Sequence, residues 1–559
     1  MFKFLFLIII VLLYQSPILS KSNSFDEFNS KELSKYFSGI VAFENKDNSK
    51  ALDFFNSSKI LINHHEPYLE RIVISLVLEN KISQAINLIK LNRKKKNSNF
   101  FEAYILLALD SLKNKNINKG IEILSNIPEK FQNDRLDFII VQSLINYSNV
   151  FKNKKVKREI NNFGNLSSIS EAFQRCFLDD KNTDSFFLEL INNSEADYSR
   201  YIFFYLSFLI EKERIEEAKI ITDDLDYIST TLLLSQGKSW VERNQIKEFN
   251  KVFSCNNHND ILGEFLFLIS NLFSSQKEFE KSNFYLSLSN YLNSKFVFNL
   301  SLVAENLYLN ENYKKSENIL KNFDKNQDFY YWYRFKKEAQ IISKTKGKQE
   351  ALKYITSKFK KIDNPNEKFI FDIANFYRNS KKYKEAIKYY SLIINKFDDD
   401  SEIKADLLYR RGASYERMGD YVNADKDLQK SLAINPNDAY VLNYLAYSWL
   451  ERDFKINRAI EMLENAYNIE NNDPYITDSI GWAYYLIHDY IKAEKLLKKA
   501  VQLMPNDPVV NDHYGDILWK LDRKIQARYF WSMVLEMEDV EEDLIDQIKN
   551  KLITGLKNS

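Results

Sequence analysis

Residues 474–507 read PYITDSIGWAYYLIHDYIKAEKLLKKAVQLMPND, and this stretch decides the fold. Apolar side chains recur at helical spacing on both sides of residues 488–489, which predicts two helices joined by a short polar turn. Gly481 in the first helix and Ala493 in the second lie twelve residues apart. The stretch therefore predicts an antiparallel helix pair in which small residues allow close packing.

The same arrangement recurs through the C-terminal half at intervals of 34 to 38 residues. One small residue of each unit lets the second helix of that unit approach, and the other lets the next unit stack. We therefore expect the small residues to be repeat-packing residues. They are Ala374 and Ala386, Gly412 and Ala424, Ala446 and Ala459, Gly481 and Ala493, and Gly515 and Ala527.

The units that begin at Ala405 and Pro474 resemble the tetratricopeptide repeat (TPR), which has about 34 residues and a helix–turn–helix structure. The matching residues are Gly412, Tyr415, Ala424 and Pro436 in the first unit, and Gly481, Tyr484, Ala493 and Pro505 in the second. The resemblance implies an all-α TPR-type α-solenoid, a right-handed superhelix of antiparallel helix pairs with roughly eleven to thirteen repeats. Only 11 glycines and 8 prolines occur in 559 residues, which argues against sandwiches and barrels with their many turns.

The regularity of the repeat divides the chain. We expect degenerate TPR-like helical repeats over residues 23–290, TPR repeats over 291–540 and a C-terminal capping helix over 541–559. Between residues 131 and 197 the period cannot be followed. That stretch reads as either a long inter-helix loop or a hinge between two solenoid segments.

Residues 1–22 predict export. Lys3 precedes an apolar run over residues 4–13, and small residues follow, as in a secretory signal peptide. The run is short for a membrane-spanning helix, which needs about 20 apolar residues. The alternative is an uncleaved N-terminal anchor, which would be the only membrane contact. Either reading predicts a periplasmic body.

The two cysteines, Cys176 and Cys255, are 79 residues apart. In a solenoid each repeat contacts only its neighbours, whereas a disulfide needs Cα atoms within about 7 Å. We therefore expect these cysteines to be too far apart to form a disulfide.

The sequence offers no complete motif for chemistry. Gly237-Lys238-Ser239 resembles part of a phosphate loop, but Leu232 stands where the loop needs a glycine. Adjacent histidines at 64 and 65 point apart and do not form a helical metal pair. The balance of 78 basic and 77 acidic residues argues against nucleic-acid binding. We predict no catalytic residue, no cofactor, no metal site and no enzyme activity.

First helices should line the concave wall of the solenoid, where another protein or peptide segment would bind. Aromatic rings there provide rigid contact area, and amides or carboxylates fix a backbone or a basic side chain. For two of the aromatics, Trp482 and Trp519, packing against neighbouring helices is an equal alternative. The predicted protein-binding groove comprises Tyr409, Asn443, Tyr447, Asp478, Trp482, Tyr485, Asp512, Asp516 and Trp519.

Residues 443–447, 478–482 and 511–519 resemble exported proteobacterial TPR proteins, which include adaptors of carboxyl-terminal processing proteases. The resemblance implies an envelope scaffold or adaptor, with an envelope protease or a cell-wall hydrolase as partner. Those adaptors are usually lipoproteins, and this sequence has no lipobox cysteine. The alternative is a structural or assembly component of an envelope export or outer-membrane biogenesis complex, and an enzyme is the third reading.

Overall fold

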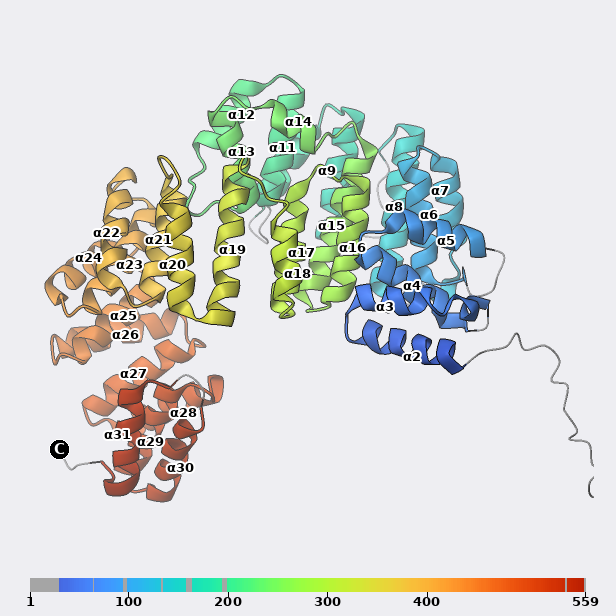
Figure 1. Ribbon diagram of the computed structural model, residues 1–559. Coiled ribbons are helices and arrows are strands. Elements are labelled where there is room, and N and C mark those ends of the chain that lie inside the picture. Colours follow the sequence, from blue (N-terminus) through green and yellow to red (C-terminus); the bar gives the residue numbers. More distant parts are fainter. Residues whose placement is uncertain are drawn as a thin grey trace, which may run out of the picture. The chain divides into compact units, whose positions relative to one another are not determined.

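The computed structural model describes residues 30–63, 65–93, 98–131, 134–156, 163–193, 199–537 and 540–556. Within these ranges the chain forms helices and turns and no strand (Figure 1), so the predicted all-α class is confirmed. Across the same ranges, every helix is too short or too polar to span a bilayer. The predicted signal peptide or anchor over residues 1–22 lies outside the described residues.

The chain divides into two compact units. The first runs to Leu225 and continues over Thr231–Arg334, and the second comprises Asp226–Thr230 and Phe335–Ser559. The α-helices that begin in the first unit are α2 (Ser30–Glu44), α3 (Asn48–Asn56), α4 (Glu66–Leu78), α5 (Ile82–Asn92), α6 (Phe101–Lys113), α7 (Ile117–Ser125), α8 (Arg135–Asn153), α9 (Asn165–Leu178), α10 (Thr183–Ile191), α11 (Ser199–Glu211), α12 (Ile215–Asp223), α13 (Leu232–Glu242), α14 (Lys247–Val252), α15 (His258–Ser275), α16 (Phe279–Leu292), α17 (Leu300–Leu309), α18 (Tyr313–Leu320) and α19 (Asp328–Lys346).

The second unit continues as a row of helix pairs. Its α-helices are α20 (Lys348–Phe359), α21 (Glu367–Asn379), α22 (Tyr383–Ile393), α23 (Glu402–Glu416), α24 (Tyr421–Ile434), α25 (Ala439–Leu450), α26 (Ile456–Ile469), α27 (Pro474–Leu486), α28 (Tyr490–Leu503), α29 (Pro508–Lys520), α30 (Lys524–Leu535) and α31 (Glu542–Thr554). Short 3₁₀ helices cover Lys59–Asn63, Glu129–Phe131, Val297–Asn299 and Ile394–Lys396.

One kind of turn joins the helix pairs in both units. In fourteen pairs the turn contains a residue with positive φ, a conformation that ends a helix and satisfies its last carbonyls. The N-terminal half thus keeps the helix-pair architecture although its small residues are irregular. Because those residues mark the repeats in the sequence, the sequence predicts roughly eleven to thirteen repeats, fewer than the fourteen pairs among the described residues. The turn residues are Lys46, Asn80, Lys115, Asp179, Glu213, Asn244, Lys277, Glu311, Gly347, Lys381, Gly419, Asp453, His488 and Asp522.

The stretch over residues 131–197, predicted as a loop or a hinge, contains three helices. They are α8, α9 and α10. Of these, α8 lies outside the series of pairs, because the chain between it and α9 is longer than a turn. This interruption explains why the sequence period is lost there.

Capping residues set where the inner helices of the second unit begin. Asp473 and Asp507 accept hydrogen bonds from the first backbone N–H groups of α27 and α29, and a proline occupies the next position in each. Proline is tolerated there because those N–H groups have no partner within the helix. Both helices therefore start at equivalent points of their repeats.

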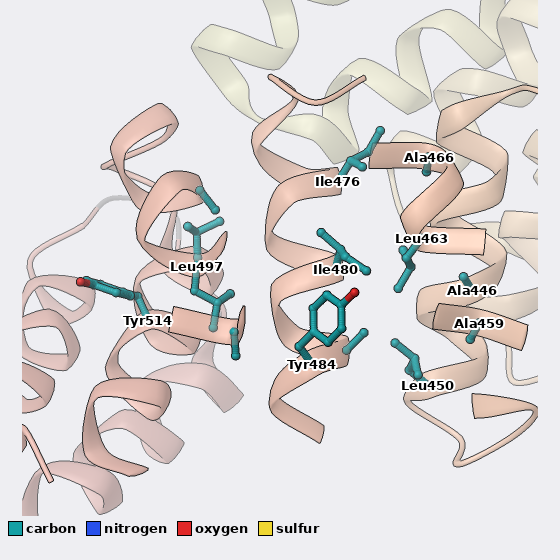
Figure 2. Close-up of a cluster of buried hydrophobic side chains, with 14 of the residues drawn as sticks. Ala446, Leu450, Ala459, Leu463, Ala466, Ile476, Ile480, Tyr484, Leu497 and Tyr514 are labelled. Atoms are coloured by element: carbon teal, nitrogen blue, oxygen red, sulfur yellow. The ribbon is translucent and has the colours of Figure 1, made fainter. Parts of the chain in front are cut away.

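The core of the second unit lies between successive pairs. Figure 2 shows Ile476, Ile480 and Tyr484 of α27 facing α26, where Leu463 is fully buried. On the other side of α27, Leu497 of α28 is also fully buried. Each first helix is therefore packed between the second helix of its own pair and that of the preceding pair.

The first unit folds back on itself. Its α16 packs against α4 and α5, and α15 packs against α8 and α9 (Figure 1). Polar contacts reinforce this: His258 Nε2 lies 2.9 Å from the Leu112 carbonyl, and the Tyr291 hydroxyl donates to Asp110 at 3.1 Å. Repeats far apart in the sequence therefore touch, and the expectation of neighbour-only contacts is wrong for this unit.

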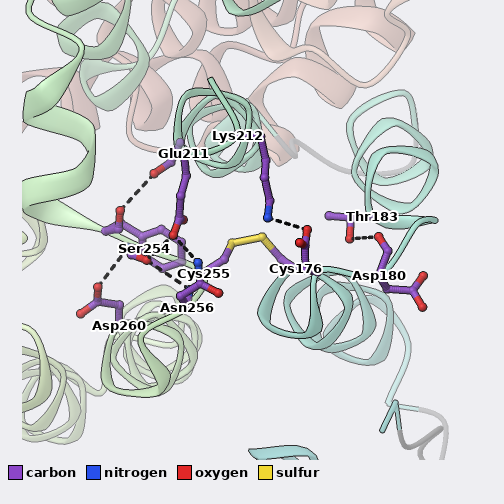
Figure 3. The surroundings of a disulfide bond; sticks show 12 residues. Cys176, Asp180, Thr183, Glu211, Lys212, Ser254, Cys255, Asn256 and Asp260 are labelled. Atoms are coloured by element: carbon purple, nitrogen blue, oxygen red, sulfur yellow. Dashed lines mark hydrogen bonds and ion pairs between the residues drawn. A yellow bond between two sulfur atoms is a disulfide. The ribbon is translucent and has the colours of Figure 1, made fainter. Parts of the chain in front are cut away.

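This folding back corrects the prediction for the cysteines. Cys176 and Cys255 form a disulfide, with their Cα atoms 5.5 Å apart (Figure 3). The prediction that they cannot bridge is wrong, because α15 packs against α9 and brings the residues before it to the end of α9. Beside the disulfide, the Ser254 hydroxyl donates to Glu211 Oε1 at 2.9 Å (Figure 3).

Candidate protein-binding site

Glycine sets the distance between the two helices in three of the C-terminal pairs, α23 with α24, α27 with α28, and α29 with α30. A Cβ added at Gly481 would lie 2.8 Å from Leu497 Cγ, and one added at Gly515 would lie 2.4 Å from Trp531 Nε1. At Gly412 the corresponding distance is 3.0 Å, to Leu428 Cγ. The predicted alanines at packing positions, namely Ala374, Ala386, Ala424, Ala446, Ala459, Ala493 and Ala527, are at most 1% exposed.

The first helices α23, α25, α27 and α29 carry the predicted groove residues, which we call the inner wall. Three rings stack along it. The Trp482 ring lies 4.6 Å from that of Tyr485 at 9°, and 4.0 Å from that of His513 at 13°. Trp482 is half-buried and packs against His513 of the neighbouring first helix.

One ring of this stack, His513, also forms a buried ion pair. Asp478 Oδ2 is 2.8 Å from His513 Nδ1, and both side chains are 8% exposed. Burial disfavours the charged imidazole, but Asp478, and more weakly Asp512 and Asp516, outweigh that effect and raise the pKa of His513. His513 is absent from the predicted groove, since nothing in the local sequence marks it as the partner of an aspartate one repeat away.

Three buried polar atoms of the inner wall form no hydrogen bond with the described residues. They are Asn443 Oδ1 on α25, and Asp478 Oδ1 and Trp482 Nε1 on α27. A buried polar group without a partner costs about 1–3 kcal/mol. A bound group that reached these atoms would supply the missing hydrogen bonds.

Other predicted groove residues surround these atoms. Tyr447 is half-buried, and its pKa is raised by burial and then by Glu451 and Asp478, so the phenol stays neutral. The Tyr409 ring makes an edge-on contact with Tyr444, with 5.7 Å between centroids. Both tyrosines therefore offer apolar rings and neutral hydroxyls to the wall.

Large side chains at the start of the inner helices face solvent. Tyr440 of α25 is 55% exposed, Tyr475 of α27 is 52% exposed and Val509 of α29 is 43% exposed. They occupy the second position of three successive first helices. This row continues the inner wall with apolar contact area that the unit itself leaves uncovered.

The last helix, α31, covers the end of the inner wall. Lys551 Nζ lies 2.6 Å from Asp512 Oδ1 and 2.8 Å from Asp516 Oδ1, and Trp531 Nε1 donates to Asp516 Oδ1 at 3.0 Å. Burial and the neighbouring Asp512 raise the pKa of Asp516 to about 6, against the opposing effect of Lys551. Asp512 and Asp516 therefore hold α31 in place.

The third groove residue of this repeat is covered as well. Gly555, with φ of +71°, is the residue directly after α31. It lies against Trp519, because a Cβ added at Gly555 would be 1.9 Å from Trp519 Cζ2. Asp512, Asp516 and Trp519 thus contact α31, and the open part of the inner wall lies on α23, α25 and α27. Nothing in the sequence around Lys551 indicates that it pairs with Asp512 and Asp516, because these partners lie more than thirty residues away.

Comparisons with known proteins agree with this architecture. Profiles described as "Tetratricopeptide repeat" match residues 368–395 and 405–438. These ranges correspond to α21 with α22 and to α23 with α24. The chain therefore contains tetratricopeptide repeats over these residues.

Two curated relatives of this TPR protein match part of its length. A "TPR repeat-containing protein PA4667" of Pseudomonas aeruginosa is 34% identical over 111 residues, 20% of this chain and 19% of that protein. A "Lipoprotein NlpI homolog" of Haemophilus influenzae is 24% identical over 159 residues, 28% of this chain and 45% of that protein. The chain thus spans less than half the length of each.

Solved TPR structures also resemble parts of the chain. The thermophilic TPR protein TTC0263 of Thermus thermophilus is 17% identical, with a TM-score of 0.30, and the match covers 34% of this chain and all of that one. MamA from Desulfovibrio magneticus RS-1 is 21% identical with a TM-score of 0.27, covering 32% of this chain and 97% of that one.

Proposed function

We propose that this TPR protein is an exported scaffold or adaptor that binds an extended segment of another protein along the open inner wall. TPR repeats are protein-binding scaffolds, and the finer assignment rests on one observation. Asn443 Oδ1, Asp478 Oδ1 and Trp482 Nε1 are buried polar atoms that lack partners among the described residues, and they lie on two adjacent inner helices. A bound segment would supply those partners.

The chemistry of the wall suits a peptide backbone or a basic side chain. Two of the unpartnered atoms are oxygens that accept hydrogen bonds, and the third is an indole N–H that donates. A backbone in extended conformation presents both donors and acceptors. The exposed rings of Tyr440 and Tyr475 add apolar contact next to these polar atoms.

The disulfide supports the proposed export. Disulfides persist in oxidising compartments such as the bacterial periplasm and are rare in the cytosol. The bridge between Cys176 and Cys255 therefore agrees with the signal-like residues 1–22. One relative is named a lipoprotein, which favours the bacterial envelope. We place the protein in the periplasm, free or anchored by an uncleaved N-terminus, with an envelope protease or a cell-wall hydrolase as partner.

Cross-linking in intact cells, followed by mass spectrometry, tests the proposal. We compare the wild type with Asn443→Ala and with Trp482→Phe, which keeps a ring but removes the indole N–H. Gln429→Ala, on the exposed face of α24, is the matched control. The two wall variants should lose the cross-linked partner while the control keeps it and all circular dichroism spectra agree. Equal recovery from every variant would refute binding at the inner wall.

The identity of the partner separates the proposal from its alternative. A protease or a hydrolase supports the adaptor, whereas subunits of an export or outer-membrane assembly machine support a structural or assembly role. Hydrolase activity of the purified chain that is retained after both wall substitutions would support the third reading, an enzyme.

A further inference from the structure

The first unit contains a cavity of about 290 Å³, at the small end of ligand pockets, which span about 300–1,000 Å³. It lies where the folded-back halves of the unit meet, so it is separate from the inner wall of the second unit. Six helices contribute: α2, α4, α6, α8, α15 and α16. The lining residues are Phe43, Ile74, Glu102, Asp134, Asp137, Phe273, Glu278, Glu280, Lys281, Phe284 and Tyr285.

The lining carries more negative than positive charge. It has five carboxylates and one ammonium group, that of Lys281. Lys46, outside the lining, pairs with Glu280. Glu102 and Asp137 form no ion pair with any described residue, although burial shields both from water. The positive groups at the cavity therefore compensate only part of its negative charge.

Part of the cavity wall is aromatic. The rings of Phe273 and Tyr285 stack at 5.5 Å and 3°, and the Phe284 ring meets Tyr285 edge-on. Lys281 Nζ already lies 5.4 Å from the centroid of the Phe273 ring. Ring faces attract cations, so these walls add to the attraction of the carboxylates.

Tyr285 points independently to a ligand. It lines the cavity and is only 5% exposed, and Glu280 Oε1, also on the lining, is a buried acceptor that has no hydrogen-bond partner among the described residues. A buried phenol usually finds a hydrogen-bond partner. The Tyr285 hydroxyl can accept a hydrogen bond as well as donate one. Burial, and then the negative charges of Asp137, Glu102 and Asp134, raise the pKa of this hydroxyl.

The pKa values of two of the carboxylates reflect their burial in this cavity. Burial raises the pKa of Glu102 to about 7 and that of Asp137 to about 6. Nearby acids add to these shifts, and Lys281 opposes them. The charged groups that face the cavity or influence these two acids are Glu70, Asp134, Glu278, Glu280 and Lys281.

We propose that this cavity binds a primary alkylammonium group of the size of a lysine side chain. The carboxylates supply charge, the Tyr285 hydroxyl supplies an acceptor, and the aromatic rings enclose the methylene groups. Aromatic walls favour an organic cation over a metal ion, which prefers oxygen ligands on all sides. The proposal does not depend on the inner wall, so either can fail alone.

The test uses the full chain and n-butylamine, which is the lysine side chain without its backbone. Saturation-transfer NMR titrations at pH 8 in low salt should show saturable binding. Glu102→Gln and Tyr285→Phe should each weaken it at least tenfold, while Glu129→Gln, an exposed acid of the same unit, should not change it. Circular dichroism verifies that each variant is folded.

Neutral and inorganic probes complete the test. Butan-1-ol has the same length as n-butylamine but no charge, so it should bind at least tenfold more weakly. The binding of n-butylamine itself should weaken at pH 5.5, because Glu102 and Asp137 take up protons there. Equal binding of butan-1-ol would overturn the proposal. So would a displacement of n-butylamine by millimolar Mg²⁺, or unchanged binding in both cavity variants.

Discussion

At the scale of single residues, Gly555 is a sensitive position because two effects coincide there. Its φ of +71° is unfavourable for any other residue, and its Cβ would collide with Trp519. We expect Gly555→Ala to lower the free energy of unfolding by about 2–4 kcal/mol. Urea unfolding followed by tryptophan fluorescence measures the loss.

Gly419 is the matched control for this substitution. Its φ is +76°, but a Cβ there would meet nothing within 4 Å. Gly419→Ala should therefore lower the free energy of unfolding by only the backbone strain, about 1–2 kcal/mol. Equal losses at the two glycines would show that Trp519 does not pack against Gly555 in solution.

Glu102 predicts a pH dependence of stability. Its pKa is about 7 in the folded chain and near 4.5 in the unfolded chain, so the folded state binds more protons between these values. Stability should therefore fall as pH rises from about 5 to about 8, by up to about 3 kcal/mol. Glu102→Gln should be more stable than the wild type at pH 8 and not at pH 5.

Thermal unfolding at the two pH values, with Glu129→Gln alongside, measures this difference. The same gain for Glu129→Gln at pH 8 would mean that general charge reduction, and not the buried Glu102, is responsible. Asp137, with a pKa of about 6, should contribute in the same direction at lower pH.

At the scale of elements, α31 behaves as the final inner helix of the second unit. Lys551→Met leaves Asp512 and Asp516 buried without their cation, and breaking such a buried pair costs about 3–5 kcal/mol. We expect a loss of that size in the free energy of unfolding, measured in urea. Lys549→Met, at an exposed position of the same helix, should change little.

Removing α31 should expose the covered part of the inner wall. In a chain that ends at Val540, Trp519 should become accessible, so the emission shifts to longer wavelength and acrylamide quenches it more strongly. The shift should disappear in a Trp519→Phe background. An unchanged spectrum would mean that α31 does not cover Trp519.

The sequence predicts elements better than contacts. Gly481 and Ala493 reveal the helix pairs because their small size is a direct requirement of close packing. A helix at the C-terminus follows from apolar spacing, but its attachment through Lys551 depends on aspartates in another repeat. Position within the repeat predicts the inner wall, whereas the pairing of Asp478 with His513 required the structure.

At the scale of the whole molecule, the disulfide closes a loop of 79 residues within the first unit. Loop-closure entropy gives such a bridge up to about 4 kcal/mol of stability. Reduction with dithiothreitol should therefore lower the melting temperature of the first unit and leave the second unit unchanged in calorimetry. Cys176→Ser with Cys255→Ser should reproduce the reduced protein and lose the response to reductant.

Thiol titration of the denatured, unreduced protein supplies the direct measurement. No free thiol is expected from protein isolated from the periplasm. Two free thiols per chain would contradict the disulfide and, with it, the proposed support for export.

The folding back of the first unit is beyond reach of the sequence. Its contacts, such as that between Tyr291 and Asp110, join residues 181 positions apart, and either residue reads as an ordinary surface group. A repeat period reports only what each pair needs from the next one. It therefore identifies the helical class correctly but gives the wrong answer for Cys176 and Cys255.

The packing of α31 against the last helix pair also restricts how this protein can gain repeats during evolution. A duplicated pair inserted between α28 and α29 would meet the two packing faces that every internal repeat already provides. A pair added after α31 would find the packing face of α29 and α30 already occupied by a helix held by Lys551. Longer relatives should therefore have gained their additional helix pairs by internal duplication, and the counterpart of α31 should still follow their last pair.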